Sequence, residues 1–172
     1  MATIHVYDSY VSEKSFIGEV ETHSGKVWGS QNLRESLLGM RISGRLGLEG
    51  HYTQENGKTL VYTVQTMNNR SLVGYVDDAG KLYSTSDRLL GRVDKEGYVY
   101  GVDEEGNIYK KNAGSRECQQ LRLRVENDKG AFEDAREGLK IGQEEISAAL
   151  LVKVTGAFAI LCMGFRPSGI IQ

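Results

Sequence analysis

The sequence predicts a mainly β domain in which repeated, glycine-containing β-hairpins pack around a pseudo-symmetry axis, with an apolar helix or strand pair near the C-terminus. Three observations lead to this fold class. A short motif recurs three times within residues 72–109, glycine makes up 21 of the 172 residues while proline occurs once, and residues 146–165 form an apolar run with one charge. Frequent glycine with rare proline indicates that many turns are made by glycine.

The repeated motif reads Val-Asp-x-x-Gly-x-(Leu/Val/Ile)-Tyr. Its first two copies start at Val73 and Leu90 and are related by a shift of 17 residues, and a shortened third copy, 101–109, follows at once. A looser copy with one extra turn residue covers 17–28. Two weaker echoes begin at Tyr52 and Val125. Self-similarity of this kind is typical of repeat folds.

Each copy predicts one β-hairpin. An apolar residue ends the first strand, Asp follows in the turn, Gly supplies a positive φ angle, and a β-branched residue or leucine with an aromatic residue starts the return strand. Successive side chains point to opposite faces of a strand, and an isolated hairpin is marginal in water. We therefore expect the copies to pack against one another around a shared core.

The segments outside the well-matched copies predict further elements. Residues 30–39 fit either a short helix, with serine at its start and glycine at its end, or a long hairpin connection. Residues 40–50 and 60–67 alternate in the manner of strands. Residues 121–125 predict a strand with one apolar and one basic face.

The C-terminal region differs in character from the repeats. We therefore divide the chain into a β-hairpin repeat domain, 1–132, and a charged, then apolar, segment, 133–172, which packs on that domain or mediates assembly. The apolar run within this segment has Lys153 as its only charge. It is either a helix or two buried strands, 150–154 and 157–163, that are broken at a glycine.

Composition argues against several classes of protein. The formal net charge is -2 and 40% of the residues are hydrophobic, which gives no electrostatic case for nucleic-acid binding and argues against disorder. Two cysteines make neither a disulfide framework nor a metal-ligand cluster, and the first 18 residues lack the basic start and apolar stretch of a signal peptide. We expect a cytoplasmic protein without a cofactor or a metal.

Several short motifs invite a catalytic or ligand-binding interpretation, and each has a simpler explanation. Gly57-Lys58-Thr59 ends like a phosphate-binding loop, yet the upstream glycine is too distant and a strand follows where a helix must begin, so a hairpin turn is favoured. The acidic residues of the repeats are expected to shape turns. The histidines, the cysteines and a basic strip are expected to be solvated or structural. These residues are His5, His23, His51, Cys118, Cys162, Lys110, Lys111, Arg116, Arg122, Arg124 and Lys129.

One repeat position is aromatic and is the best candidate for a binding site. If the copies surround an axis, the rings at this position form either a packed central layer or a ring around a small pocket. No residue is assigned a catalytic or metal-binding role. The candidate binding residues are Trp28, Tyr83, Tyr100 and Tyr109.

The three longer copies share Gly-x-Val, then three or four residues, then Gly-x-(Leu/Val) and an aromatic residue, and the shortened copy keeps the second half of this pattern. The residues that carry this pattern are Gly18, Val20, Gly25 and Trp28, then Gly74, Val76, Gly80 and Tyr83, then Gly91, Val93, Gly97 and Tyr100, then Val102, Gly106 and Tyr109. The pattern resembles the bacterial beta-flower proteins, small domains in which such hairpins surround a pseudo-fourfold axis. It differs from tyrosine-aspartate repeats, whose Arg-Tyr-x-Tyr core is absent here. The resemblance implies a fold and no activity.

The sequence favours a non-enzymatic structural or protein-interaction module, because the repeats occur without a converging nucleophile, base or metal set. The expected partner is another protein or a second copy of the chain. Two alternatives stay open. One is a small-molecule-binding protein or enzyme with its site at the pseudo-axis. The other is membrane attachment through 146–165, a run that is long enough to span but carries a lysine that costs about 2.5 to 3.5 kcal/mol on insertion scales.

Overall fold

The computed structural model describes residues 3–8, 16–29, 49–66, 69–103, 105–108, 118–126, 129–135, 138–141, 144–163, 165–166 and 169–170. Strands dominate these residues. They are β1 (Thr3–Asp8), β2 (Phe16–Glu21), β3 (Lys26–Gly29), β4 (Glu49–Glu55), β5 (Lys58–Thr66), β6 (Asn69–Val76), β7 (Lys81–Tyr83), β8 (Leu89–Val93), β9 (Tyr98–Gly101), β10 (Cys118–Glu126), β11 (Phe132–Asp134), β12 (Leu139–Ile141), β13 (Glu144–Ile146), β14 (Phe165–Arg166) and β15 (Gly169–Ile170).

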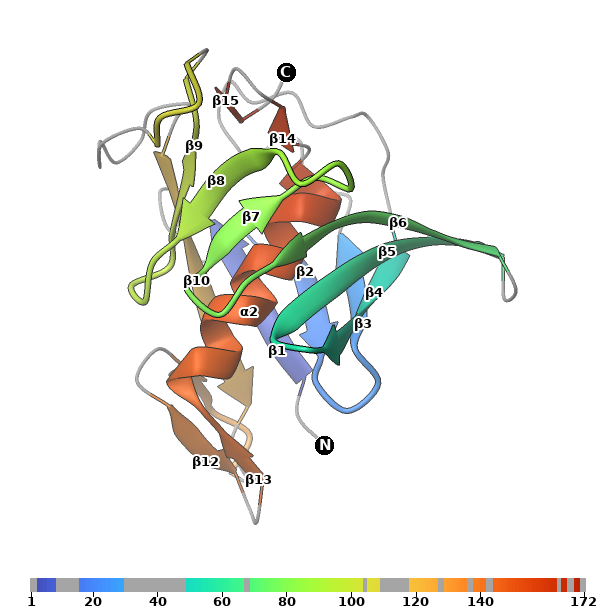
Figure 1. Cartoon of the computed structure of the whole chain (residues 1–172). Helices are drawn as coiled ribbons and strands as arrows, with labels where there is room; N and C mark the ends of the chain where they lie inside the picture. Colours follow the sequence, from blue (N-terminus) through green and yellow to red (C-terminus); the bar gives the residue numbers. More distant parts are fainter. Residues whose placement is uncertain are drawn as a thin grey trace.

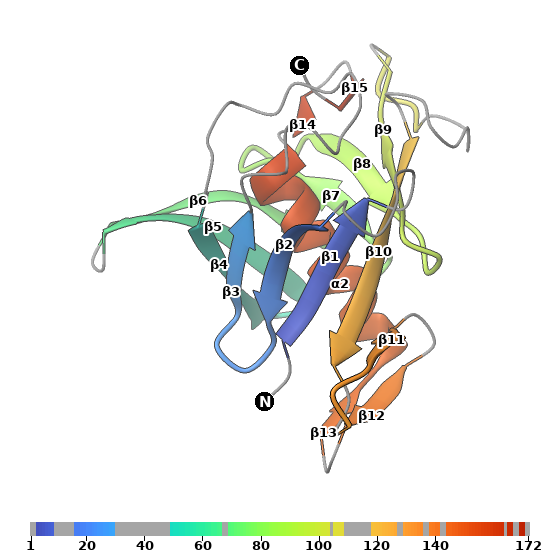
Figure 2. The same ribbon diagram turned by 180° about the vertical axis from the view of Figure 1, so that it is seen from behind.

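Strands β1 to β10 form a closed antiparallel barrel (Figures 1 and 2). Each strand pairs with the next, and β10 also pairs with β1, which closes the ring. β11 pairs with the far end of β10, while β12–β13 and β14–β15 form two small separate sheets. The predicted fold class, mainly β with hairpins around an axis and an apolar C-terminal element, is confirmed.

That C-terminal element is a helix that lies inside the barrel (Figures 1 and 2). α2 (Ala148–Phe158) begins after Ser147, whose hydroxyl accepts a hydrogen bond from the backbone N of Leu150 at 3.1 Å, and it continues as the π-helical turn η1 (Ala159–Met163). Strands β3, β5, β6, β8 and β10 all contact α2. Every residue from 154 to 162 is buried, as expected for a helix surrounded on all sides. The interpretation of this run as two strands is therefore wrong.

In the part of the chain that the structure describes, no helix combines the length and the apolar character needed to cross a bilayer.

Glycine on the inner face of the barrel makes room for this helix. A Cβ added at Gly18 would lie 2.5 Å from Phe158 Cε2. The helix contributes a glycine of its own, because a Cβ at Gly156 would lie 2.8 Å from Val76 Cγ2. Residues two apart share a face of a strand, so Gly-x-Val in the repeat places both glycine and valine inward. The helix occupies the space that the missing side chain leaves.

The hairpin turns use the chemistry that the repeat predicts. Asp77 Oδ1 accepts hydrogen bonds from the backbone N of Ala79 at 3.0 Å and of Lys81 at 2.9 Å, and Asp94 and Asp103 repeat this arrangement. The glycine three residues after each of these aspartates has a φ between 84° and 90°. These three aspartates are thus turn formers, as predicted.

The turn glycines also connect neighbouring hairpins. The carbonyl of Gly25 accepts a hydrogen bond from the backbone N of Tyr52 at 2.8 Å, and that of Gly80 accepts one from Val93 at 2.8 Å. The carbonyl of Gly97 accepts the equivalent bond from the backbone N of Leu121 on β10 at 2.8 Å. Each of these three turns is therefore bonded to a strand of the hairpin that follows it.

The repeat copies correspond to hairpins, including the two weak echoes. The well-matched copies form β6–β7 and β8–β9, the looser copy forms β2–β3, and the echoes form β4–β5 and β10–β11. The shortened copy makes one isolated bridge between Val102 and Ile108. Gly57-Lys58-Thr59 is a hairpin turn running into β5, because Asn56 and Gly57 have φ of 52° and 78°. A phosphate-binding loop is excluded there.

The remaining predicted elements have mixed outcomes. The strands predicted at 60–67 and 121–125 correspond to parts of β5 and β10. In β10 the apolar side chains are buried inside the barrel and the arginines alternate with them, as predicted. Of the strand predicted at 40–50, only the last two residues are described, and they belong to β4. The helix or connection predicted at 30–39 lies outside the described residues.

Candidate functional site

The three described aromatic residues of the predicted binding site do not face the barrel axis. In three of the four cases, the residue just before the ring is a core valine or leucine that is fully buried. Because side chains alternate along a strand, Trp28, Tyr83 and Tyr100 point to the outer face. Tyr109 lies outside the described residues. These three rings therefore do not form the central layer or axial pocket expected from the sequence, since the helix occupies that position (Figure 1).

Tyr83 belongs to a stacked pair on the outer face of β6 and β7. Its ring centre lies 5.0 Å from that of Tyr75, whose hydroxyl donates a hydrogen bond to Asp87 Oδ1 at 2.6 Å. Lys58 Nζ lies 4.5 Å from the centre of the Tyr75 ring. The hydrogen bond to Asp87, followed by burial and nearby charges, raises the pKa of Tyr75 to about 12. These contacts hold the pair within the sheet.

Tyr100 is 3% exposed and has its own structural contacts. Its hydroxyl donates to Asp94 Oδ2 at 2.9 Å, so that one aspartate both shapes the turn and fixes the ring. Arg92 Cζ lies 5.1 Å from the ring centre. Tyr100 therefore offers little surface to a ligand.

Trp28 differs from both tyrosines because it lies beside a hollow on the outer surface. The hollow has a volume of about 300 Å³ and is lined by Thr3, Glu19, Glu21, Lys26 and Trp28. Glu19 stands directly opposite Trp28 across the β2–β3 pair, and Glu21 stands opposite Lys26. Thr3 pairs with Glu21 from β1. One hairpin and one adjoining strand thus build the hollow.

A series of half-buried aromatic side chains runs from this hollow across the outer face of the barrel. The centre of the Trp28 ring lies 6.3 Å from the centre of the Phe16 ring. The Phe16 ring centre in turn lies 5.7 Å from that of Tyr7 and 5.5 Å from that of His5. His5 in turn lies 5.0 Å from Phe132 on β11. We call these five residues the outer aromatic cluster.

The described arginines of the predicted basic strip contact other groups of the protein. Arg122 donates to both carboxylate oxygens of Asp134, each at 3.0 Å. Arg124 Cζ lies 5.6 Å from the ring centre of Tyr7 and 5.7 Å from that of Phe132, at the border of the outer aromatic cluster. The members of the strip before β10, Lys110, Lys111 and Arg116, lie outside the described residues.

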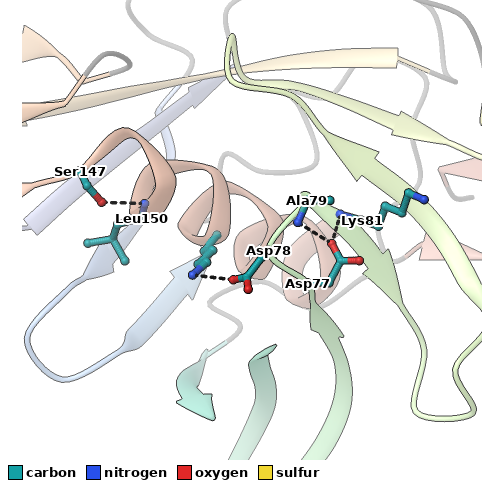
Figure 3. Close-up of polar contacts among 7 residues, drawn as sticks. Asp77, Asp78, Ala79, Lys81, Ser147 and Leu150 are labelled. Atoms are coloured by element: carbon teal, nitrogen blue, oxygen red, sulfur yellow. Dashed lines mark hydrogen bonds and ion pairs between the residues drawn. The ribbon is translucent and has the colours of Figure 1, made fainter. Parts of the chain in front are cut away.

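A second hollow lies at the N-terminal end of α2. Its volume is about 510 Å³, and its walls are the β2–β3 turn, residues 52–54 of β4 and the first turns of the helix. Lys153 in this wall forms an ion pair of 3.1 Å with Asp78, next to the turn that Asp77 shapes (Figure 3). Burial raises the pKa of Tyr52, also in this wall, to about 12. The hollow combines polar side chains with a lysine that is already paired.

The histidines occupy three separate places. His5 belongs to the outer aromatic cluster, and His23 is exposed in the β2–β3 turn. The ring of His51 stacks on Tyr62 at 5.2 Å and contacts Arg70, and its pKa is lowered by burial and by the charge of Arg70. Across the described ranges, no three His, Cys, Asp or Glu side chains gather in a way that could hold a metal ion.

Cys162, the cysteine whose side chain the structure describes, gives no case for a nucleophile. Cys162 is fully buried inside the barrel, and this burial raises the pKa of its thiol, which keeps it protonated near neutral pH. The side chain of Cys118 lies outside the described part of the structure.

The carboxylates beside Trp28 were missed by the sequence reasoning. Glu19 and Glu21 are two residues apart in a predicted strand, so alternation places both on one face. The same rule places Trp28 on that face of the return strand. The part of the hollow that this hairpin builds could therefore have been predicted from the sequence. Thr3 was not, because no strand was predicted for its segment, which the structure shows as β1 paired with β2.

Comparison of the chain with models of protein families, with curated proteins and with solved structures found no match. The outer aromatic cluster, the two hollows and the occupied axis are therefore the observations from which a function is inferred.

Proposed function

We propose that this protein is a non-enzymatic protein-interaction module whose contact surface is the outer aromatic cluster with the hollow beside Trp28. One observation carries the proposal: the helix fills the barrel axis, while half-buried aromatic side chains and a hollow lie together on the outer face. Aromatic residues are enriched at protein interfaces, where a few of them supply most of the binding free energy. A partner on this face would remove apolar surface from water.

An enzymatic role has less support from the groups that could do acid–base work. Burial raises the pKa of Tyr52, and the hydrogen bond to Asp87 is the largest cause that raises the pKa of Tyr75. A tyrosine with a raised pKa stays protonated near neutral pH and is a poor general base there. His51 is held between an arginine and a tyrosine ring, and Cys162 is enclosed in the barrel. These groups are occupied by structural contacts.

A small-molecule site is the second candidate function. The hollow at the N-terminal end of α2 favours it, because about 510 Å³ falls within the usual size of ligand pockets. The helix occupies the axis beyond this hollow, so a ligand would lie against His23, Tyr52 and Lys153 at the end of the barrel. We rank this function second because Lys153 is already neutralised by Asp78.

We also propose that the fold is a variant of the beta-flower arrangement and that the protein is bacterial and cytoplasmic. The hairpins with Asp and Gly turns around one axis support the likeness to that family. A free, buried thiol at Cys162 fits a reducing compartment. The proposed partner is another protein, and self-association is one outcome that the following experiment detects.

Selection from a random peptide library tests the interaction surface while the partner is still unidentified. Enriched peptides should bind the full chain and lose about 30-fold in affinity for Trp28→Ala, the effect of about 2 kcal/mol that is typical of a central aromatic anchor. Leu72→Ala is the matched control, because Leu72 is an apolar side chain on β6 that is 40% exposed. Light scattering of the unliganded chain reports self-association.

Two results would contradict the proposal. One is a selection that enriches no peptide. The other is a set of peptides that bind Trp28→Ala as tightly as they bind Leu72→Ala, which would place their site elsewhere on the barrel.

A further inference from the structure

The barrel repeatedly places a cation over an aromatic ring on its outer face. Lys58 Nζ lies 4.5 Å from the ring centre of Tyr75, and Arg92 Cζ lies 5.1 Å from that of Tyr100. The same arrangement recurs on β5 and β1. A cation within about 6 Å of a ring centre is attracted by the negative charge of the ring face. In these cases the protein supplies its own cation.

Trp28 departs from this pattern. Among the described residues, no lysine or arginine lies over its ring, and the ring beside it is that of Phe16. The residue directly across from it is Glu19, and Glu21 follows on the same face. Tryptophan attracts cations more strongly than tyrosine or phenylalanine does. The hollow therefore has an aromatic wall and an acidic wall that suit a cation from another molecule.

The balance of charge in the hollow also favours a cation. Among the described residues that line it, Glu19 and Glu21 supply two carboxylates and Lys26 supplies one ammonium group. Glu21 Oε1 accepts a hydrogen bond from Ser24 Oγ at 3.0 Å, and Glu19 Oε1 lies 3.9 Å from His5 Nε2. A carboxylate has about four acceptor positions on its two oxygens, so both groups can accept further hydrogen bonds.

The size of the hollow limits the ligand to a small group. A volume of about 300 Å³ is at the lower end of the range for ligand pockets, which suits one side chain better than a large cofactor. A guanidinium group is planar, stacks on aromatic faces and donates two parallel hydrogen bonds to a carboxylate. An ammonium group is a compact, strongly hydrated charge and makes neither contact as well.

We propose that the hollow beside Trp28 binds the guanidinium group of an arginine side chain carried by the protein partner. The inference rests on the proposed function and names the chemistry of its ligand. The aromatic wall stacks on the guanidinium plane, and the two glutamates accept its N–H groups. Thr3, on the adjoining strand, completes the wall of the hollow.

The test uses the full chain and short blocked glycine peptides that differ only at the central residue. That residue is arginine, lysine or citrulline, the uncharged analogue of arginine. Trp28 is the only tryptophan, so its fluorescence and its indole N–H signal in NMR report the hollow directly. The arginine peptide should give a saturable change, the lysine peptide should bind several-fold more weakly, and the citrulline peptide should give no change.

Variants then assign the effect to the carboxylates. The double variant Glu19→Gln, Glu21→Gln keeps the shape of both side chains and should weaken binding of the arginine peptide about tenfold or more. Glu55→Gln is the matched control, because Glu55 is an exposed carboxylate at the end of β4, next to a different hairpin turn. The Glu55→Gln protein should bind the arginine peptide with the same affinity as the wild type.

Several results overturn the inference. Equal responses to the arginine and citrulline peptides, no response to either, or full affinity in the double variant would exclude a cation site. If library peptides bind through Trp28 but contain no basic residue, the inference fails while the proposed function stands. If free arginine amide binds the hollow and no library peptide does, the ligand is a small guanidinium compound, and both proposals fail.

Discussion

Lys153 Nζ lies 3.1 Å from Asp78 Oδ1, so the one charged side chain of the barrel helix is paired with the turn between β6 and β7 (Figure 3). The side chain of Lys153 is 21% exposed and that of Asp78 is 70% exposed. The ion pair thus remains in contact with water at the end of the barrel. The aliphatic part of a lysine can pack against apolar surface while its charge reaches solvent, which explains how this lysine is tolerated in α2.

The exposure of the pair predicts a small effect on stability when it is removed. Asp78→Asn should lower the free energy of unfolding by at most about 1 kcal/mol, and the loss should shrink at high salt. Lys153→Glu should cost more, because it places a second carboxylate beside Asp78. Urea unfolding at low and high ionic strength measures both. A salt-independent loss of several kcal/mol for Asp78→Asn would show that the pair is far less hydrated than its exposure indicates.

The close contact at Gly156 predicts a reversal of ordinary helix propensity. Alanine is favoured over glycine inside a helix by about 1 kcal/mol. Here Gly156→Ala should destabilise the protein, because the new Cβ would lie 2.8 Å from Val76 Cγ2 and 3.0 Å from Leu82 Cδ2, and overpacking costs about 1 to 3 kcal/mol. Thermal and urea unfolding of the variant give the sign directly.

A second substitution tests the cause of that loss. Val76→Ala removes the methyl groups that the new Cβ would meet, so the double variant should be more stable than the sum of the two single effects predicts. Additive effects, or a Gly156→Ala protein more stable than the wild type, would mean that the helix and the barrel wall are not in tight contact there.

The repeat made most of the hairpins predictable, because hairpin formation depends on residues that are close in sequence. Asp94 and Gly97 shape their turn through local hydrogen bonds and a positive φ, and both were readable from the motif. The alternation of valine and aromatic residues also predicted two distinct faces. It did not predict which face is inside, because both faces are apolar enough to be buried.

The position of the helix determines which face of each strand points into the barrel. Gly18 on β2 and Phe158 on the helix are neighbours in space, yet they are 140 residues apart in sequence, and no local pattern relates them. Once a helix occupies the axis, little space is left beside it, and in the well-matched copies glycine and valine fill the inward positions. For the same reason Trp28 lies on the outer face of the barrel and not at its axis, and the candidate site is on that face.

Because α2 is part of the core, a chain that lacks it should not fold. A chain ending after Gly142 lacks the fully buried Leu151, Val154 and Phe158, so its barrel would have an empty axis and should not fold. Circular dichroism and light scattering on a sizing column measure this. The full-length variant Phe158→Ala is the control, with an expected loss of about 3 to 5 kcal/mol. A folded, monomeric shortened chain would contradict the role of α2 as core.

The contact between Tyr75 and Asp87 predicts a loss of stability at high pH. The hydrogen bond to Asp87 raises the pKa of Tyr75 to about 12, so the folded state holds this proton more tightly than the unfolded state, where the pKa is near 10.0. The stability from this contact is therefore fully present below pH 10 and is lost as the pH rises from about 10 to about 12. Asp87→Asn should bring the titration of the Tyr75 ring, followed by NMR, closer to pH 10.

Tyr52 provides the internal control for this measurement. Its pKa is also raised to about 12, but burial is the cause, so its titration should be the same in the wild type and in Asp87→Asn. If Tyr75 still titrates near 12 after Asp87→Asn, the carboxylate is not what holds its proton. If both tyrosines shift together, the substitution has loosened the barrel, because only a change in packing alters the burial of Tyr52.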